Sequence, residues 1–269
     1  MKTIMLHVHE DGEQANRLDV ALDLARLDGG HIACVQVTGI DGYAAEPFGE
    51  MFGLAAMVDT IHDQDRLVRQ AIETRLRQAG IRWDWRCFDG PVVETLIAQS
   101  RLADVVVISQ PAAPRPGVVP PLSIIGDVVM HASAPLLVVP AGQRGLSATG
   151  AAMLAWNGSA EAAHAMRAGV PLLRHAAAVH IVEVSDDHPG TPASEAATYL
   201  ERQGVACEVH EWPAKGRATA TALLHAITEL DADYLVMGAY GHSRLREMVL
   251  GGVTRALLAR AQVPLLLVH

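Results

Sequence analysis

The sequence predicts an α/β protein built from two tandem, doubly wound, five-stranded parallel sheets. Short apolar runs alternate with amphipathic helical patterns along the whole chain, and the order of these elements repeats once. Half of the 269 residues are hydrophobic but only 4% are aromatic, and alanine, valine and leucine predominate. This composition favours helices packed on buried parallel sheets over an aromatic-rich β-sandwich.

The repeat aligns without a gap in the last part of each half. ADVVVISQPAAPRPGVVPPLSIIGDVVMHASAPLLVVP begins at Ala103, and ADYLVMGAYGHSRLREMVLGGVTRALLARAQVPLLLVH begins at Ala232. Further upstream, TIMLHVHEDGEQ matches AAMLAWNGSAEA, and RQAGIRWDWRCF resembles ERQGVACEVHEW. We therefore expect one domain over residues 1–140 and a second over residues 150–269, joined by the polar, glycine-rich segment PAGQRGLSATG.

Each domain is expected to contain five strands joined by helices. The strands are expected near residues 2–9, 31–38, 81–87, 103–109 and 135–139, and near 151–156, 178–184, 205–211, 232–238 and 263–268. Helical patterns such as RLDVALDLARL and EAAHAMRAGVPLL fill the gaps. This alternation predicts right-handed crossovers, with helices on both faces of each sheet.

Charge and hydropathy exclude two classes of partner. The formal net charge is −9 and the chain has no long run of lysine or arginine, whereas nucleic-acid binders carry a basic footprint. The first residues, MKTIMLHVHED, meet acidic side chains before a secretory-type apolar run, and no stretch has the length of a membrane span. We expect a cytoplasmic protein that binds neither nucleic acid nor a membrane.

Four glycines crowd one connection near the end of the chain. Gly238, Gly241, Gly251 and Gly252 lie between an apolar strand and the helical run VTRALLARA. Ligands of open parallel sheets bind beyond the carboxyl ends of the strands, and glycines at a helix start let backbone amides face a phosphate. The segment predicts a phosphate site; the alternative is that the glycines serve only turns and helix caps.

These residues resemble a known family. GAYGHSRLREMVLGGVT is similar to the signature of universal stress proteins, in which Gly-x-x-Gly is followed after nine residues by Gly and Ser or Thr. MLAWNGSAEAAHAMRAGVPLL resembles the first strand and helix of tandem members. The resemblance implies the strand order 3-2-1-4-5 in each domain and association of domains through their last strands. Some members bind ATP at the glycine loop and others do not.

The resemblance also implies a binding site. The loop amides would hold the phosphates, and the turn after the first strand of the second half would approach adenine and ribose. The expected nucleotide-binding residues are Ala155, Trp156, Asn157, Gly238, Ala239, Gly241, His242, Arg244, Gly251, Gly252, Val253 and Thr254. The expected cofactor is ATP or another adenine nucleotide, with or without Mg²⁺.

Two positions depart from the family pattern. Gly252 occupies the Ser/Thr position, so the side-chain hydroxyl that is expected to hydrogen-bond a phosphate is missing, although the backbone amide remains. The hydroxyl of Thr254 is a candidate substitute. Asn157 replaces an acidic residue and can still hydrogen-bond a ribose hydroxyl. Arg244 either meets a phosphate or faces solvent.

The first half lacks the glycine pattern. Ser109, Ala112 and Leu122 stand where the second half has Gly238, Gly241 and Gly251, and the segment contains five prolines, which supply no amide donor. We expect at most one nucleotide site per chain, in the second half.

Other chemistry has weaker support. His7 and His9 share one side of the first strand, so they form either a metal site with Glu10 and Asp11 or a hydrogen-bonded core histidine beside an altered cleft. The remaining histidines are scattered, so we expect no metal site. The chain has no dinucleotide fingerprint, Walker lysine loop or Gly-x-Ser-x-Gly elbow, so we expect no catalytic residues and at most slow ATP hydrolysis.

These observations predict a stress-response regulatory protein that binds ATP or a related adenine nucleotide through its C-terminal domain and forms a homodimer. The alternative is a nucleotide-free protein-association module of the same fold.

Overall fold

The computed structural model describes residues 1–39, 51–110, 122–185, 190–241 and 251–269. The first half of the chain contains β1 (Thr3–Val8), α1 (Gln14–Asp28), β2 (His31–Thr38), α2 (Met51–Ala79), β3 (Arg82–Asp89), α3 (Val92–Gln99), β4 (Val105–Ser109), α4 (Leu122–His131) and β5 (Leu136–Val139). The second half contains β6 (Ala151–Trp156), α5 (Ala160–Leu173), β7 (Ala178–Ser185), α6 (Ala193–Arg202), β8 (Glu208–Pro213), α7 (Thr219–Glu229), β9 (Tyr234–Gly238), α8 (Gly252–Arg260) and β10 (Leu265–Val268). All ten expected strands are present within a few residues.

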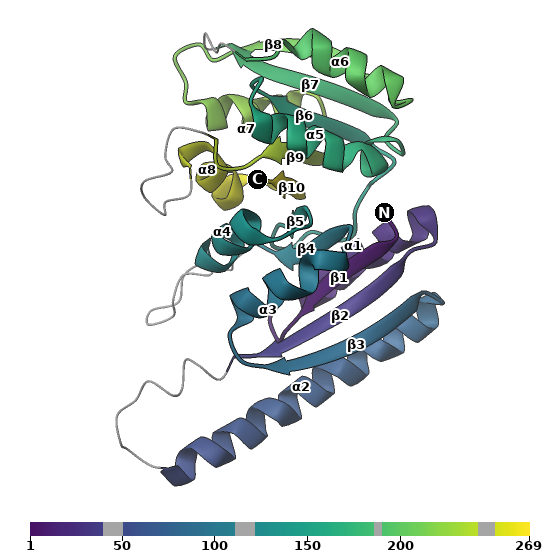
Figure 1. The fold of residues 1–269 in the computed structure, drawn as a ribbon, viewed down its shortest axis with the longest axis vertical. Coiled ribbons are helices and arrows are strands. Elements are labelled where there is room, and N and C mark those ends of the chain that lie inside the picture. Colours follow the sequence, from purple (N-terminus) through teal and green to yellow (C-terminus); the bar gives the residue numbers. More distant parts are fainter. Residues whose placement is uncertain (40–50, 111–121, 186–189, 242–250) are drawn as a thin grey trace.

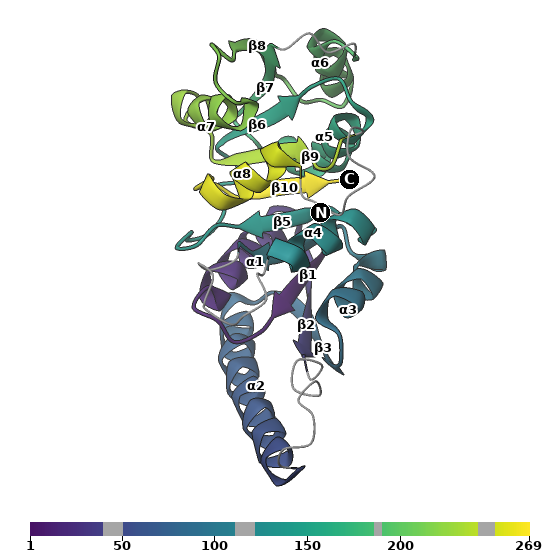
Figure 2. The same ribbon diagram turned by 90° about the vertical axis from the view of Figure 1, so that its left-hand side faces the viewer.

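The strands form one continuous sheet in the order β3-β2-β1-β4-β5-β10-β9-β6-β7-β8 (Figure 1). Each half is parallel and follows the expected order 3-2-1-4-5. The halves meet through β5 and β10, which pair antiparallel with Leu137 opposite Leu266. The expectation that the last strands associate is therefore confirmed within one chain. Both chain ends lie near the middle of the sheet, where the halves meet (Figure 2).

Helices cover both faces of this sheet, as the alternating pattern predicts. One apolar cluster packs under α1, α2, α5 and α6, and the other packs under α3, α4, α7 and α8. Both clusters cross the junction, since Leu137 and Leu266 belong to the first and Leu136 and Leu265 to the second. The two halves therefore share their core layers rather than touching only at a polar surface. No helix in the described residues combines the length and apolar character needed to cross a membrane.

One strand begins later than expected, at Glu208 rather than near residue 205. Gly204 has a φ of 78°, and the amide of Val205 donates to the carbonyl of Leu200 at 2.9 Å. This six-to-one hydrogen bond across a left-handed residue is the Schellman ending of a helix. The residues expected to start the strand instead complete the turn that ends α6.

The segment between the halves packs on α1 instead of hanging free. The amide of Leu146 donates to Asp23 at 2.9 Å, and the amide of Gly142 donates to Glu13 at 2.9 Å. Leu146 and Ala148 are buried. The glycines of this segment allow turns, because Gly142 and Gly145 have φ values of 75° and 74°.

Candidate functional site

The carboxyl edge of the second half brings two groups of expected site residues together. In the β6–β9 pair Ala155 lies opposite Met237, so Trp156 and Gly238 follow at the same edge of the sheet. Because β6 and β9 each lead into a crossover helix, α5 and α8 both begin at this edge. Helix starts carry amides without intrahelical partners and the positive end of the helix dipole. The edge can therefore attract an anion.

Gly238 is required by packing against α5. A Cβ atom at this position would lie 2.6 Å from the carbonyl carbon of Glu161 and 2.7 Å from the amide nitrogen of Ala162. Real Cβ atoms do not approach backbone so closely. The glycine thus lets the end of β9 lie directly on the first turn of α5.

The turn after Gly238 is fixed to the end of the last strand. The buried Ala239 donates its amide to the carbonyl of Val268 at 2.7 Å. Tyr240 has a φ of 65° and packs edge-on against His269, with ring centroids 6.1 Å apart. The exposed Gly241 follows, and among the described residues no atom lies within 4 Å of a Cβ placed there. The chain therefore leaves the sheet by a turn that is anchored through Ala239 and Tyr240.

The start of α8 is also open. Gly251 is the N-cap, with φ −52° and ψ 140°, and no side chain caps the helix. Among the described residues, no atom lies within 4 Å of a Cβ placed at Gly251 or Gly252, and neither glycine has a positive φ. Against these residues, glycine is needed neither for backbone conformation nor for packing, and it adds no side chain of its own over the first amides of α8. Val253 is half-buried and Thr254 is 4% exposed, so the candidate substitute hydroxyl belongs to a side chain packed inward.

The turn after β6 is held by its own contacts. The indole of Trp156 is buried and donates to the carbonyl of Thr191 at 2.8 Å. Asn157 is exposed and accepts a hydrogen bond from the amide of Ser159 at 3.2 Å, which closes a local turn before α5. Gly158 has a φ of 70°, and a Cβ there would lie 2.5 Å from the amide nitrogen of Thr191. Of these side chains, Asn157 remains at the surface.

The expected site residues His242 and Arg244 lie outside the described residues, as does the segment 242–250 that connects Gly241 to Gly251. Ala112 of the first half lies outside them as well.

The corresponding edge of the first half is filled by a buried arginine. Arg17 on α1 is 0% exposed, and its Nη1 donates to Ser109, the counterpart of Gly238, at 2.7 Å. Nη1 also donates to Asp11 at 2.7 Å, and Nη2 donates to Gln14 at 2.7 Å. Further hydrogen bonds reach the carbonyls of His7 at 3.1 Å and His9 at 3.2 Å. A guanidinium with this set of partners leaves no free donor face for a ligand.

The electrostatics of this network match its geometry. Burial on its own raises the pKa of Asp11, but the hydrogen bond from His9 and the charge of Arg17 outweigh it and hold that pKa well below its usual range. Burial lowers the pKa of Arg17, and the Asp11 carboxylate opposes the shift. The Asp11 carboxylate compensates the buried charge of Arg17, and removing either partner would leave the other charge buried and unpaired. The first half therefore holds a structural cation at this edge.

Sequence reasoning did not identify Arg17. The internal repeat could have indicated its importance. Arg17 in α1 aligns with Ala165 in α5, and Ala165 is buried. An arginine in place of a buried alanine requires a partner inside the protein. The expectation of a degenerate first half rested on its missing glycines and on its prolines, whereas the described residues show a filled cleft.

The expectation for His7 was partly wrong. His7 is buried, but neither of its ring nitrogens has a hydrogen-bond partner among the described residues. It stacks instead on His9, with ring centroids 4.6 Å apart. Burial first, and then the charges of His9 and Arg17, lower the pKa of His7 well below its usual value. Nε2 of His9 lies 2.7 Å from Oδ2 of Asp11, and the carbonyl of His9 accepts a hydrogen bond from Arg17.

Comparison with known proteins places this geometry in a family. Residues 151–269 match the sequence model described as the universal stress protein family. A search of curated proteins found no match. A universal stress protein from Archaeoglobus fulgidus DSM 4304 has a similar structure, with a TM-score of 0.76 at 17% identity over 99% of this chain and 97% of that one. A functionally unknown protein from Pseudomonas aeruginosa PAO1 follows, with a TM-score of 0.58 at 16% identity over 99% and 92%. Residues 151–269 therefore match the universal stress protein family by sequence, and a universal stress protein shares the fold along nearly the whole length of the chain.

Proposed function

We propose that this chain is a cytoplasmic stress-response regulator that binds ATP or a related adenine nucleotide at the carboxyl edge of its second half. The observation that carries the proposal is the open start of α8. Neither the backbone angles of Gly251 and Gly252 nor their packing against the described residues requires glycine, and neither residue has a side chain that would cover the first amides of the helix. Uncovered amides at a helix start are a common way of binding phosphate.

Each part of the edge has a proposed role. The amides of Gly252 and Val253 hold phosphate oxygens, and the exposed Asn157 at the end of β6 meets the ribose. Gly241 lets the turn lie close to the ligand. Gly238 lets the end of β9 pack against the first turn of α5 and so positions the edge. Mg²⁺ bound with the nucleotide would offset part of the phosphate charge.

One nucleotide per chain is expected. The two halves are proposed to act as domains over residues 1–140 and 150–269, and Arg17 occupies the corresponding edge of the first domain. Nucleotide bound at this edge would bias association with partner proteins.

Proline and alanine at position 252 test the phosphate contact. Gly252 is the first residue of α8, where proline fits a helix, and the Gly251 ψ of 140° suits a residue before proline. Gly252→Pro therefore removes one amide donor, whereas Gly252→Ala keeps it. By isothermal titration with ATP, we expect Gly252→Pro to bind about 10- to 100-fold more weakly and Gly252→Ala about as well as wild type.

Two outcomes contradict this proposal at different levels. Equal affinity of the two variants excludes a phosphate contact through the amide of Gly252. If the wild-type protein neither binds adenine nucleotides nor releases one on denaturation, nucleotide binding itself is excluded.

The second candidate function is a nucleotide-free association module. It is favoured by the absence of a hydroxyl at Gly252 and by Asn157, whose side-chain oxygen already accepts from Ser159. Under this alternative, mutations in the edge leave partner binding unchanged. Any ATP hydrolysis would have to exceed that of Gly252→Pro to indicate an enzyme.

We also propose that two chains associate as a homodimer. Because β5 and β10 already pair within the chain, the dimer must use another surface. Sedimentation analysis that finds only monomers at micromolar concentration contradicts this proposal.

A further inference from the structure

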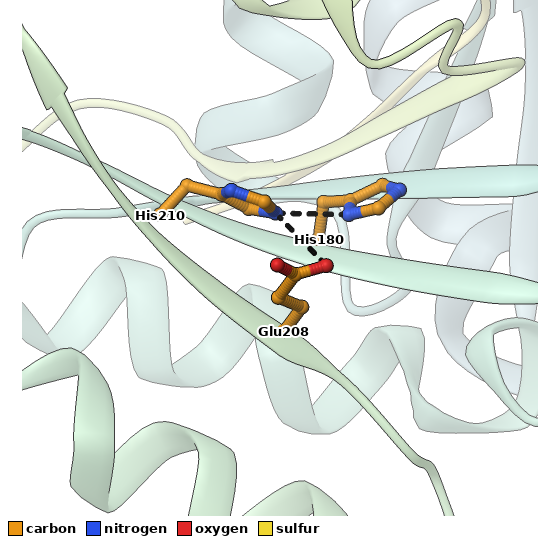
Figure 3. Close-up of side chains that lie close together, drawn as sticks. All are labelled: His180, Glu208 and His210. Carbon is orange, nitrogen blue, oxygen red and sulfur yellow. Dashed lines mark hydrogen bonds and ion pairs between the residues drawn. The ribbon is translucent and has the colours of Figure 1, made fainter.

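Two histidines and a glutamate meet on neighbouring strands of the second half (Figure 3). In the β7–β8 pair His180 lies opposite Glu208, and Val182 lies opposite His210. Side chains alternate along a strand, so His180, Glu208 and His210 project from the same face of the sheet. This face is covered in part by α7, whose residues share an apolar cluster with Val182 and Val184.

The ligand atoms of the three side chains converge. Nδ1 of His180 lies 3.0 Å from Nε2 of His210, and Nε2 of His210 lies 3.8 Å from Oε2 of Glu208. All three ligand atoms lie within 4.8 Å of one another. Zinc bonds of about 2.0 to 2.2 Å at tetrahedral angles place ligand atoms about 3.3 to 3.5 Å apart. The two measured separations, 3.0 Å and 3.8 Å, lie on either side of those values.

We propose that His180, Glu208 and His210 bind a divalent zinc-type cation on the β7–β8 face. Two imidazoles and one carboxylate suit Zn²⁺ and similar first-row ions, whereas Mg²⁺ and Ca²⁺ prefer sites made of oxygen ligands. Glu208 has 70% of its side chain exposed, which leaves room for a water molecule or another ligand at the fourth position.

The two imidazoles already face each other. Nδ1 of His180 and Nε2 of His210 share one hydrogen bond, in which the tautomers decide the donor. A cation bound between the rings would replace this hydrogen bond with a bond to each ring nitrogen.

The first half provides an internal comparison. Met5 aligns with Met153 and pairs with Ala33, just as Met153 pairs with His180. The positions that correspond to the cluster are therefore Ala33, Asp84 and Arg86. Asp84 there pairs with Arg86 at 3.1 Å and with the imidazole of His31 at 2.6 Å. The carboxylate is common to both halves, and only the second half has an imidazole at each of the other two cluster positions.

The cluster is separate from the proposed nucleotide site. His180 and Glu208 lie near the amino-terminal ends of β7 and β8, and the open amides of α8 lie at the carboxyl edge of the sheet. β8 is also an edge strand of the sheet. A cation here would tie this edge strand to β7 and does not depend on nucleotide binding.

The test titrates the metal-free full chain with Zn²⁺ by calorimetry, with His210→Arg as the main variant. This substitution installs the ion pair seen at Asp84 and Arg86, so the variant is expected to keep its fold and its unfolding temperature without zinc. We expect wild type to bind one Zn²⁺. The affinity of His210→Arg for Zn²⁺ should be lower by a factor of about 100 or more. His225→Ala is the matched control, because His225 is a half-exposed histidine of α7 outside the cluster.

Two further readouts support or overturn the proposal. Zinc at 100 times its dissociation constant should raise the unfolding temperature of wild type and His225→Ala by about 5 °C but leave His210→Arg unchanged. Co²⁺ in place of zinc should give visible d–d absorption that His180→Ala abolishes. No zinc binding by wild type overturns the proposal, and so does zinc binding of equal affinity in His210→Arg or His180→Ala.

Discussion

Arg17 on α1 donates a 2.7 Å hydrogen bond to the hydroxyl of Ser109 at the end of β4. Ser109 is the counterpart of Gly238, which instead lies against the backbone of α5. The two halves of one chain thus use the same edge of the same fold in opposite ways. One half fills the edge with its own cation, and the other leaves helix amides uncovered.

Removing that cation should weaken the fold strongly. Arg17→Ala leaves Asp11 and the carbonyls of His7 and His9 without their buried partner. We expect the free energy of unfolding to fall by about 3–5 kcal/mol, measured by urea denaturation. Arg26→Ala, which removes an exposed ion pair of the same helix, should cost less than about 1 kcal/mol. Equal effects of the two variants would show that the Arg17 network contributes little.

Gly238 should not tolerate a side chain. Gly238→Ala drives a Cβ atom into the backbone of Glu161 and Ala162, so β9 and α5 must separate. We expect a loss of about 1–3 kcal/mol of stability by thermal or urea unfolding. Gly241→Ala is the control, because its Cβ meets no atom of the described residues within 4 Å, and it should change stability by at most about 0.5 kcal/mol. A Gly238→Ala protein as stable as wild type contradicts the close packing described here.

His7 should make the protein less stable in mild acid. Its pKa is lowered in the folded state, so below about pH 6.5 the unfolded chain takes up a proton that the folded chain does not. Stability therefore falls as pH drops from about 6.5 to 5, by up to about 1.4 kcal/mol per pH unit from this group. His180 contributes a slope of the same sign.

The variant His7→Leu isolates the contribution of His7. It should flatten the pH dependence of the unfolding free energy between pH 5 and 7 relative to wild type. Measurements in this range avoid the titration of Asp11, whose lowered pKa makes its stabilisation fall only in stronger acid, below about pH 4. The same slope in both proteins would mean that His7 is protonated equally in the folded and unfolded states.

Leu137 and Leu266 should be coupled across the junction of the halves. They lie opposite each other in the antiparallel β5–β10 pair, and both are 0% exposed. Each leucine-to-alanine substitution should cost about 2–5 kcal/mol. Contact across the pair should make the double variant depart from additivity by at least about 0.5 kcal/mol in a double-mutant cycle. Additive effects would show that the halves unfold without influencing each other at this point.

Much of the fold could be predicted from sequence because its signals are local. Apolar runs such as Val105–Ser109 and helical patterns between them fix the strands to within a few residues, and the internal repeat shows that the pattern occurs twice. The late start of β8 at Glu208 was missed, because the turn through Gly204 and Val205 depends on how a helix ends rather than on hydropathy.

The candidate site was predictable only where its residues are close in sequence. Gly238 and Gly241 were identified, but the contact of Gly238 with α5 depends on the distance between two elements that are far apart in the chain. His180 and His210 are separated by 30 positions and become neighbours through the register of β7 and β8. The histidines therefore looked scattered.

Because β5 and β10 pair within a single chain, the peptide link between the halves fixes their ratio. Proteins that associate through separate subunits can exchange partners, and their composition then follows concentration. In this chain the half closed by Arg17 and the half with open amides are covalently matched one to one. Dilution therefore cannot produce a pair of two first halves or a pair of two second halves.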